Sequence, residues 1–154
     1  MPDAVPIRTE SLLTSPGTDA LIFHMQRQAT IRHRTSLYEE ATAIVQREYA
    51  SDLSLDDIAR RVASSRRQLQ RAYAEIGNTT FREHLTAVRM ERAADLLRLR
   101  GPTVREVAHR VGYRQPAQFA KAFRRHHGTS PSAFRARRPP IAGEGPPRIA
   151  VQPF

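Results

Sequence analysis

The chain has 154 residues, with 25 Lys and Arg against 15 Asp and Glu, so its formal charge at pH 7 is +10. A chain of one-domain size that is this basic favours a polyanionic partner, with nucleic acid ahead of an anionic membrane. The absence of Cys excludes disulfide-stapled domains, Cys-ligated zinc fingers, iron–sulfur centres and thiol nucleophiles. No apolar run approaches the ~20 residues of a membrane-spanning helix. We therefore expect a cytoplasmic protein that does not contact membranes.

Residues 1–35 are predicted to form a flexible N-terminal arm, because they hold three prolines and no sustained apolar periodicity. Within the arm, residues 21–23 (Leu-Ile-Phe) and Met25 form an apolar patch that could dock on the main domain. The basic stretch over residues 26–34 is interpreted either as a solvated linker, which is the simpler alternative, or as an arm that contacts DNA. At the other end, residues 139–154 contain five prolines and are predicted to be disordered.

Residues 36–138 hold 20 basic and 11 acidic residues and so carry +9 of the formal charge. Ser54 before two acids, and the pairs Thr80–Glu83 and Thr103–Glu106, are typical of helix N-termini, because these side chains cap backbone N–H groups. Strand signals are nearly absent, so the predicted fold class is all-α. The predicted helices lie near residues 37–50, 55–62, 66–76, 81–99, 104–111, 116–127 and 131–137.

An internal repeat lies within this block. Residues 57–63 (Asp-Ile-Ala-Arg-Arg-Val-Ala) resemble residues 106–112 (Glu-Val-Ala-His-Arg-Val-Gly), and residues 69–73 (Leu-Gln-Arg-Ala-Tyr) match residues 119–123 (Phe-Ala-Lys-Ala-Phe). Each copy is a short helix, a turn with a small residue and a second helix, which is the pattern of a helix-turn-helix.

The second helix of the first copy has an apolar stripe of Leu69, Ala72, Tyr73 and Ile76 at helical spacing. Its opposite face carries the predicted base-contacting residues. Arg can donate two hydrogen bonds to guanine, and Gln can pair with adenine, in the major groove. A merely solvated basic face is the simpler alternative, but the turn and the repeat favour DNA readout. The predicted readers in this copy are Arg66, Arg67, Gln70 and Arg71.

The second copy is expected to discriminate bases less. Phe119, Ala122 and Phe123 point inward, and the outward side offers Ala117, Gln118 and Lys121 as base contacts. Ala carries little hydrogen-bonding information, so Gln118 and Lys121 are the stronger candidates. Three arginines of this copy are predicted to hold phosphates, which fix the register on DNA without reading sequence. These phosphate contacts are Arg114, Arg124 and Arg125.

Between the copies, the helix predicted over residues 81–99 has an apolar stripe of Phe81, Leu85, Val88, Leu96 and Leu97. About 19 residues at 1.5 Å rise make a rod of roughly 28 Å. Two recognition helices on this rod could reach successive major grooves ~34 Å apart. Because both units belong to one chain, we expect unlike half-sites without a palindrome, and a monomer that suffices for binding.

The stretch from about Tyr38 to Arg138 resembles the DNA-binding domain of the AraC/XylS family of bacterial transcription regulators. The resemblance implies two helix-turn-helix units, over about 36–77 and 102–138, joined by a linker helix over about 80–100. It places base-reading positions at Arg67, Gln70, Arg71, Ala117, Gln118 and Lys121. The segments that carry it are 53–59 (Leu-Ser-Leu-Asp-Asp-Ile-Ala), 69–73, 89–93 (Arg-Met-Glu-Arg-Ala), 107–113 (Val-Ala-His-Arg-Val-Gly-Tyr) and 128–135 (Gly-Thr-Ser-Pro-Ser-Ala-Phe-Arg).

Members of that family commonly carry an effector or dimerisation domain, which 35 N-terminal residues are expected not to build. The predicted function is a sequence-specific transcription regulator that binds double-stranded DNA at the nucleoid, with RNA polymerase or another regulator as protein partner. The alternatives are an architectural protein that binds DNA through charge alone and a module whose apolar patch recruits another protein. The six histidines lack metal-ligand spacing and no catalytic motif is present, so we expect no enzymatic activity, no metal and no cofactor.

Overall fold

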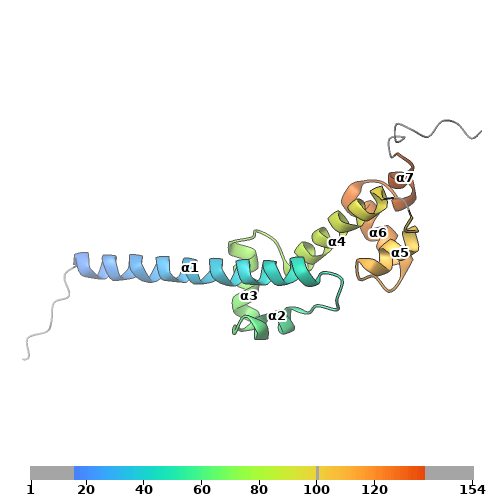
Figure 1. The fold of residues 1–154 in the computed structure, drawn as a ribbon. Coiled ribbons are helices and arrows are strands. Elements are labelled where there is room, and N and C mark those ends of the chain that lie inside the picture. The colour runs from blue at the N-terminus through green and yellow to red at the C-terminus, as the bar shows by residue number, and fades with distance from the viewer. Residues whose placement is uncertain (1–15, 100, 138–154) are drawn as a thin grey trace, which may run out of the picture.

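The computed structural model describes residues 16–99 and 101–137, and in these residues it contains seven α-helices and no strand. In Figure 1 the helix α4 connects a group formed by α1–α3 with a second group formed by α5–α7, and the first half of α1 projects away from both. The all-α class and the two helix-turn-helix units on a long helix are thereby confirmed. The bounds are α1 (Pro16–Glu48), α2 (Leu55–Arg61), α3 (Arg66–Glu75), α4 (Phe81–Arg98), α5 (Val104–Arg110), α6 (Pro116–His127) and α7 (Pro131–Ala136).

The bounds of α2 to α7 all lie within one residue of the predicted ones, and side-chain caps explain where α2, α3, α4, α5 and α7 begin. The Ser54 hydroxyl accepts the Asp57 N–H, and Thr80 and Thr103 each close a capping box with the Glu three residues later. A third box, between Ser65 and Gln68, begins α3 and was not singled out from the sequence. Each such cap stabilises a helix by roughly 1 kcal/mol.

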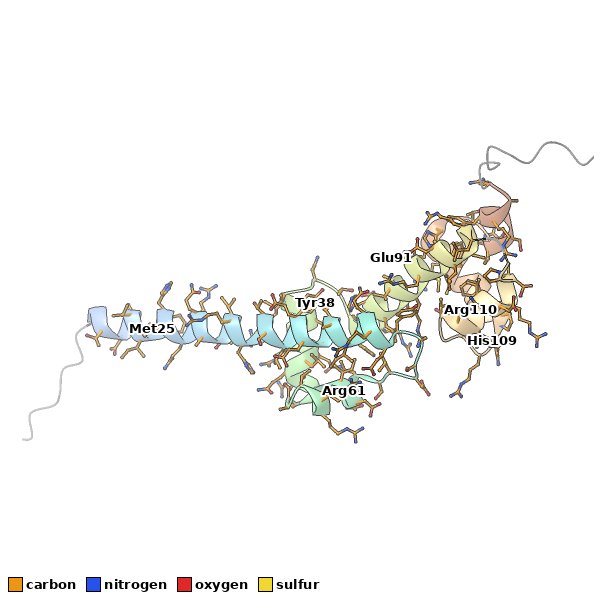
Figure 2. The ribbon with its side chains drawn as sticks, in the orientation of Figure 1. Met25, Tyr38, Arg61, Glu91, His109 and Arg110 are labelled. Atoms are coloured by element: carbon orange, nitrogen blue, oxygen red, sulfur yellow. The ribbon has the colours of Figure 1, made fainter. Side chains whose placement is uncertain are left out.

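The prediction for the N-terminal arm is wrong over residues 16–35, because α1 begins at Pro16 rather than near residue 37. Proline suits a first helical turn, and no other proline interrupts α1. The apolar patch does not dock: Phe23 is 68% and Met25 61% exposed, and Figure 2 places Met25 on the projecting part of α1. Apolar periodicity missed this helix because residues 17–33 are exposed on every side. Residues 1–15, and the predicted tail over 139–154, lie outside the described residues.

The second half of α1 packs against α3 and completes the first unit. Leu37, Ala41, Ile44 and Val45 are buried there, and the ring of Tyr38 meets that of Tyr73 edge-on at 5.3 Å between centroids. At either end of this contact an ion pair joins α1 to its neighbours, Arg34 with Glu75 and Arg61 with Glu48. Figure 2 shows Tyr38 where α1 crosses α3.

Two hydrophobic cores share α4. The first core takes Leu85 and Val88 from α4, and the second takes Met90, Ala93, Ala94 and Leu97. The predicted inward residues Leu69, Ala72, Tyr73, Phe119 and Phe123 are all buried, whereas Ile76, Phe81, Leu96 and Ala122 are only partly buried. The linker helix therefore belongs to both units rather than merely separating them.

The two turns of the repeat have the same backbone geometry. In each, three successive N–H groups close the end of the first helix, for example Ser64 N–H on Ala59 O at 2.8 Å and Tyr113 N–H on Ala108 O at 2.9 Å. The residue before each of these donors has a positive φ, 50° at Ala63 and 86° at Gly112. The small turn residue noted in the sequence is therefore the left-handed residue that lets the chain reverse into the second helix.

Candidate nucleic-acid interface

The recognition helix of the first unit, α3, is anchored by Leu69 and Tyr73, which are almost completely buried. This anchoring leaves Arg67, Gln70 and Arg71 exposed on the opposite face. Arg66, at the first turn, donates from Nη1 to the Asp56 carboxylate at 2.7 Å, and both side chains are more than half exposed. An exposed pair of this kind contributes little stability, so Arg66 can exchange Asp56 for a phosphate or a base at small cost.

The recognition helix of the second unit, α6, is anchored by Phe119 and Phe123, both fully buried. It begins at Pro116, after Gln115, which makes no side-chain cap. In α3 the glutamine at the third helical position closes the capping box, whereas the corresponding Gln118 of α6 makes no such cap. The Gln118 amide lines a groove and can therefore meet a ligand.

Both recognition helices face one groove. Arg66 and Gln70 of α3 and Gln118 of α6 line a groove of about 880 Å³, with Arg82 and Thr86 of α4 between them. The N-terminal parts of α3 and α6 therefore lie on the same side of α4, which is the arrangement needed to meet one face of a duplex.

A second groove, of about 900 Å³, continues along α6 and collects Gln118, Lys121 and Arg125 beside Arg82 and Glu83 of α4. Hydrogen bonds from Thr80 hold the pKa of the Glu83 carboxyl below its usual range, with smaller contributions from Thr79 and from the positive charge of Arg125. Glu83 is thus committed to capping α4, so it adds one fixed negative charge to an otherwise basic groove.

The other predicted contacts lie outside these grooves. Ala117 and Arg124 are exposed on α6 and line neither groove of the described chain. The Arg114 Nη2 lies 3.4 Å from the Asp52 Oδ2. Because the two side chains are 89% and 92% exposed, this ion pair contributes little to stability. The structure thus brings Arg66, Gln70, Gln118, Lys121 and Arg125 together beside α4, and leaves Arg67, Arg71, Arg114, Ala117 and Arg124 on the surrounding surface.

The contribution of α4 itself was not predicted from the sequence. Arg82, Thr86 and Arg89 line the first groove, and their spacing of four and three residues puts them on one face of the helix. That polar face, beside the apolar stripe, was the available signal. Arg82 is exposed and lines both grooves, which makes it a further candidate phosphate contact. Near the end of α6, the centroids of the His127 and Phe123 rings lie 4.4 Å apart, and the His127 Nε2 lies 3.1 Å from Met90 O.

Neither a metal site nor a membrane span is found among the described residues. No group of three or more His, Asp or Glu side chains there could hold a metal ion. No helix in this part of the chain is both long and apolar enough to cross a membrane.

The fold and the paired recognition helices are those of a helix-turn-helix protein. A family profile described as "Helix-turn-helix domain" matches residues 58–137, and the chain belongs to this AraC-type helix-turn-helix family. The chain is 34% identical over 92 residues, 60% of its length and 33% of the relative's, to the Msm operon regulatory protein of Streptococcus mutans.

Solved structures agree with this assignment. The C-terminal domain of AraT, a response regulator from Geobacillus stearothermophilus, superposes with a TM-score of 0.66 at 30% identity and covers 73% of this chain and 94% of that one. The DNA-binding domain of AdpA, a global transcriptional factor, in complex with a target DNA superposes with a TM-score of 0.59 at 30% identity. This match covers 65% of this chain and 89% of that one. The chain spans about a third of the length of the first curated relatives.

Proposed function

We propose that the chain is a sequence-specific regulator of transcription that places α3 and α6 in successive major grooves of double-stranded DNA. The observation that supports this most directly is the groove shared by Arg66, Gln70 and Gln118 on one side of α4. The bound target DNA of the AdpA domain and the operon regulator among the relatives support the same function.

The exposed side chains suggest a division of roles. Arg66, Arg67, Gln70 and Arg71 of the first unit, with Gln118 and Lys121 of the second, read base edges, and Ala117 supplies at most a contact to a thymine methyl group. Arg82, Arg114, Arg124 and Arg125 hold phosphates and fix the register.

The remaining parts of the proposal concern partners and location. A monomer suffices for DNA binding, because one chain carries both recognition helices. RNA polymerase or another regulator is the proposed protein partner, and the exposed Leu21, Phe23 and Met25 on α1 offer apolar surface for such a contact. The protein acts at the nucleoid in the cytoplasm and is not itself an enzyme.

The affinity for DNA is expected to fall steeply with salt. If five or six cationic side chains reach phosphates, including the four arginines that hold phosphates in this proposal, the slope of log K against log salt is about −4.5 to −5.4, since each contact releases counterions. Fluorescence anisotropy on a duplex selected from a random pool, and on a scrambled duplex, measures this slope. A slope near zero on both would contradict nucleic-acid binding. A steep slope with equal affinities would identify the architectural alternative.

Substituting a base-contacting residue and substituting a phosphate-contacting residue are expected to have different effects on DNA binding. Arg71→Ala lowers affinity for the selected duplex by roughly 1–3 kcal/mol and relaxes preference at one or two base pairs. Arg124→Ala removes the same type of side chain and therefore serves as the matched control, and it weakens all duplexes about equally. Competition binding with single-base variants of the selected duplex checks this. Equal losses on every sequence for Arg71→Ala would assign Arg71 to the phosphates.

A further inference from the structure

Arg89 occupies the junction between the two hydrophobic cores. On one side of it in α4, Val88 belongs to the first core, and on the other side Met90 belongs to the second. The Arg89 Nε donates to Tyr49 O at 2.7 Å and its Nη2 donates to Ser51 O at 2.8 Å. Both acceptors lie in the connection from α1 to α2, so Arg89 ties the middle of α4 to the first unit.

The same guanidinium also meets the second unit. Its Cζ lies 5.6 Å from the centroid of the Tyr113 ring, which is within the range of a cation–π contact. Tyr113 immediately follows Gly112, the left-handed residue in the turn between α5 and α6. One side chain therefore contacts both units at once.

The backbones of the two units approach closely beside Arg89. A Cβ at Gly112 would lie 2.7 Å from Ala50 O and 3.0 Å from the Arg89 Nη2. Tyr49 packs against both hydrophobic cores. We call this contact region, formed by residues 49–51, Arg89 and residues 112–113, the inter-unit seam.

We propose that Arg89 is a positioning residue that holds the two helix-turn-helix units in one relative orientation through the inter-unit seam. Units joined by a small interface move relative to each other by default. One guanidinium opposes that motion, because it makes two charge-assisted hydrogen bonds to the first unit and a cation–π contact to the second. The consequence for DNA rests on the proposed function: Arg89, together with the length of α4, sets which spacing of half-sites can be bound.

The first test measures the orientation without DNA. Because the chain has no Cys, Glu39→Cys on α1 and Ser132→Cys on α7 place unique spin labels on exposed positions of the two units. Pulsed electron paramagnetic resonance on the full chain then reports the distance between the units. We expect one narrow distance distribution in this parent. After Arg89→Met we expect a distribution about twice as broad, since the hydrogen bonds and the cation–π contact of Arg89 are then lost. Arg89→Lys, which keeps the charge but loses the fork, is expected to fall between them. An unchanged width after Arg89→Met overturns the proposal.

A second pair of variants decides the question even if Arg89→Met fails to fold. Gly112 and Gly128 both have a positive φ, 86° and 72°, so alanine strains the backbone at either position. A Cβ at Gly128 meets nothing within 4 Å, whereas a Cβ at Gly112 enters the seam. We expect Gly112→Ala to displace the distance distribution and Gly128→Ala to leave it unchanged. The same response from both variants would overturn the seam as the device that sets the orientation.

The consequence for DNA is read separately. On duplexes in which the spacing of selected half-sites varies by one or two base pairs, the parent is expected to prefer one spacing, and Arg89→Met to lose most of that preference. A parent that binds no duplex would contradict the proposed function and leave the distance result standing. A parent and an Arg89→Met variant with the same spacing preference would overturn the role of Arg89 on DNA.

Discussion

Inserting about five base pairs between the two half-sites of a selected duplex is expected to weaken binding by about 10²- to 10⁴-fold, because half of a ~10.5-base-pair turn moves the second site to the far side. The affinity left is that of one unit alone. The loss is large because the second unit, once tethered, binds at a high effective concentration. Fluorescence anisotropy at fixed salt, with two to ten inserted pairs, measures it.

The longest insertion separates rigid from flexible coupling. Ten base pairs return the second site to the original face but move it ~34 Å further away. The linker helix α4 has 18 residues and is packed into both cores, so the recognition helices cannot follow, and affinity is expected to stay low. Recovery at ten base pairs would indicate units joined flexibly. Affinity that ignores every insertion would show that α6 does not engage DNA.

Phe123→Ala is expected to lower the free energy of unfolding by about 3–5 kcal/mol, which is a large part of the ~5–15 kcal/mol of a typical domain. Phe123 is fully buried in the second core. The centroid of its ring lies 5.7 Å from that of Phe119 and 5.3 Å from that of Phe134. Its removal leaves a cavity that neighbouring rings fill only in part. Urea denaturation followed by circular dichroism gives the free energy.

Phe23→Ala is the matched control, because it makes the same substitution in a helix at a side chain that is 68% exposed. We expect a change within about 0.5 kcal/mol there. A loss of less than 1 kcal/mol for Phe123→Ala would contradict the second core as described. A loss at Phe23 that matches the loss at Phe123 would show that the projecting part of α1 is buried in solution.

The helix bounds of residues 55–136 could be predicted closely because their signals are local. Ser54, Thr80 and Thr103 each cap N–H groups within three residues, so the sequence beside the helix start contains both partners. The start of α1 could not be predicted in the same way. Residues 17–33 of α1 bury no side chain, so this part of the helix lacks the apolar spacing that reveals packed helices.

Only part of the candidate interface could be predicted from the sequence, for the same reason. The buried residues of each recognition helix, such as Leu69 in α3 and Phe119 in α6, recur at helical spacing. This spacing predicts that Arg67, Gln70, Arg71 and Lys121 face outward. Arg82 was missed because only the arrangement of three helices shows that it lies in a groove with Gln70 and Gln118.

The all-α class, each copy of the helix-turn-helix pattern, the caps at Ser54, Thr80 and Thr103 and the outward faces of α3 and α6 could be predicted from the sequence, because each depends on residues a few positions apart in the chain. Only the tertiary structure shows that both recognition helices lie on one side of α4, that Phe23 stays exposed instead of docking on the main domain, and that Arg89 contacts both units. Arg89 reaches carbonyls 38 and 40 residues away in the chain. Contacts of that range depend on how whole helices pack, and packing is a property of all the cores together rather than of any local pattern.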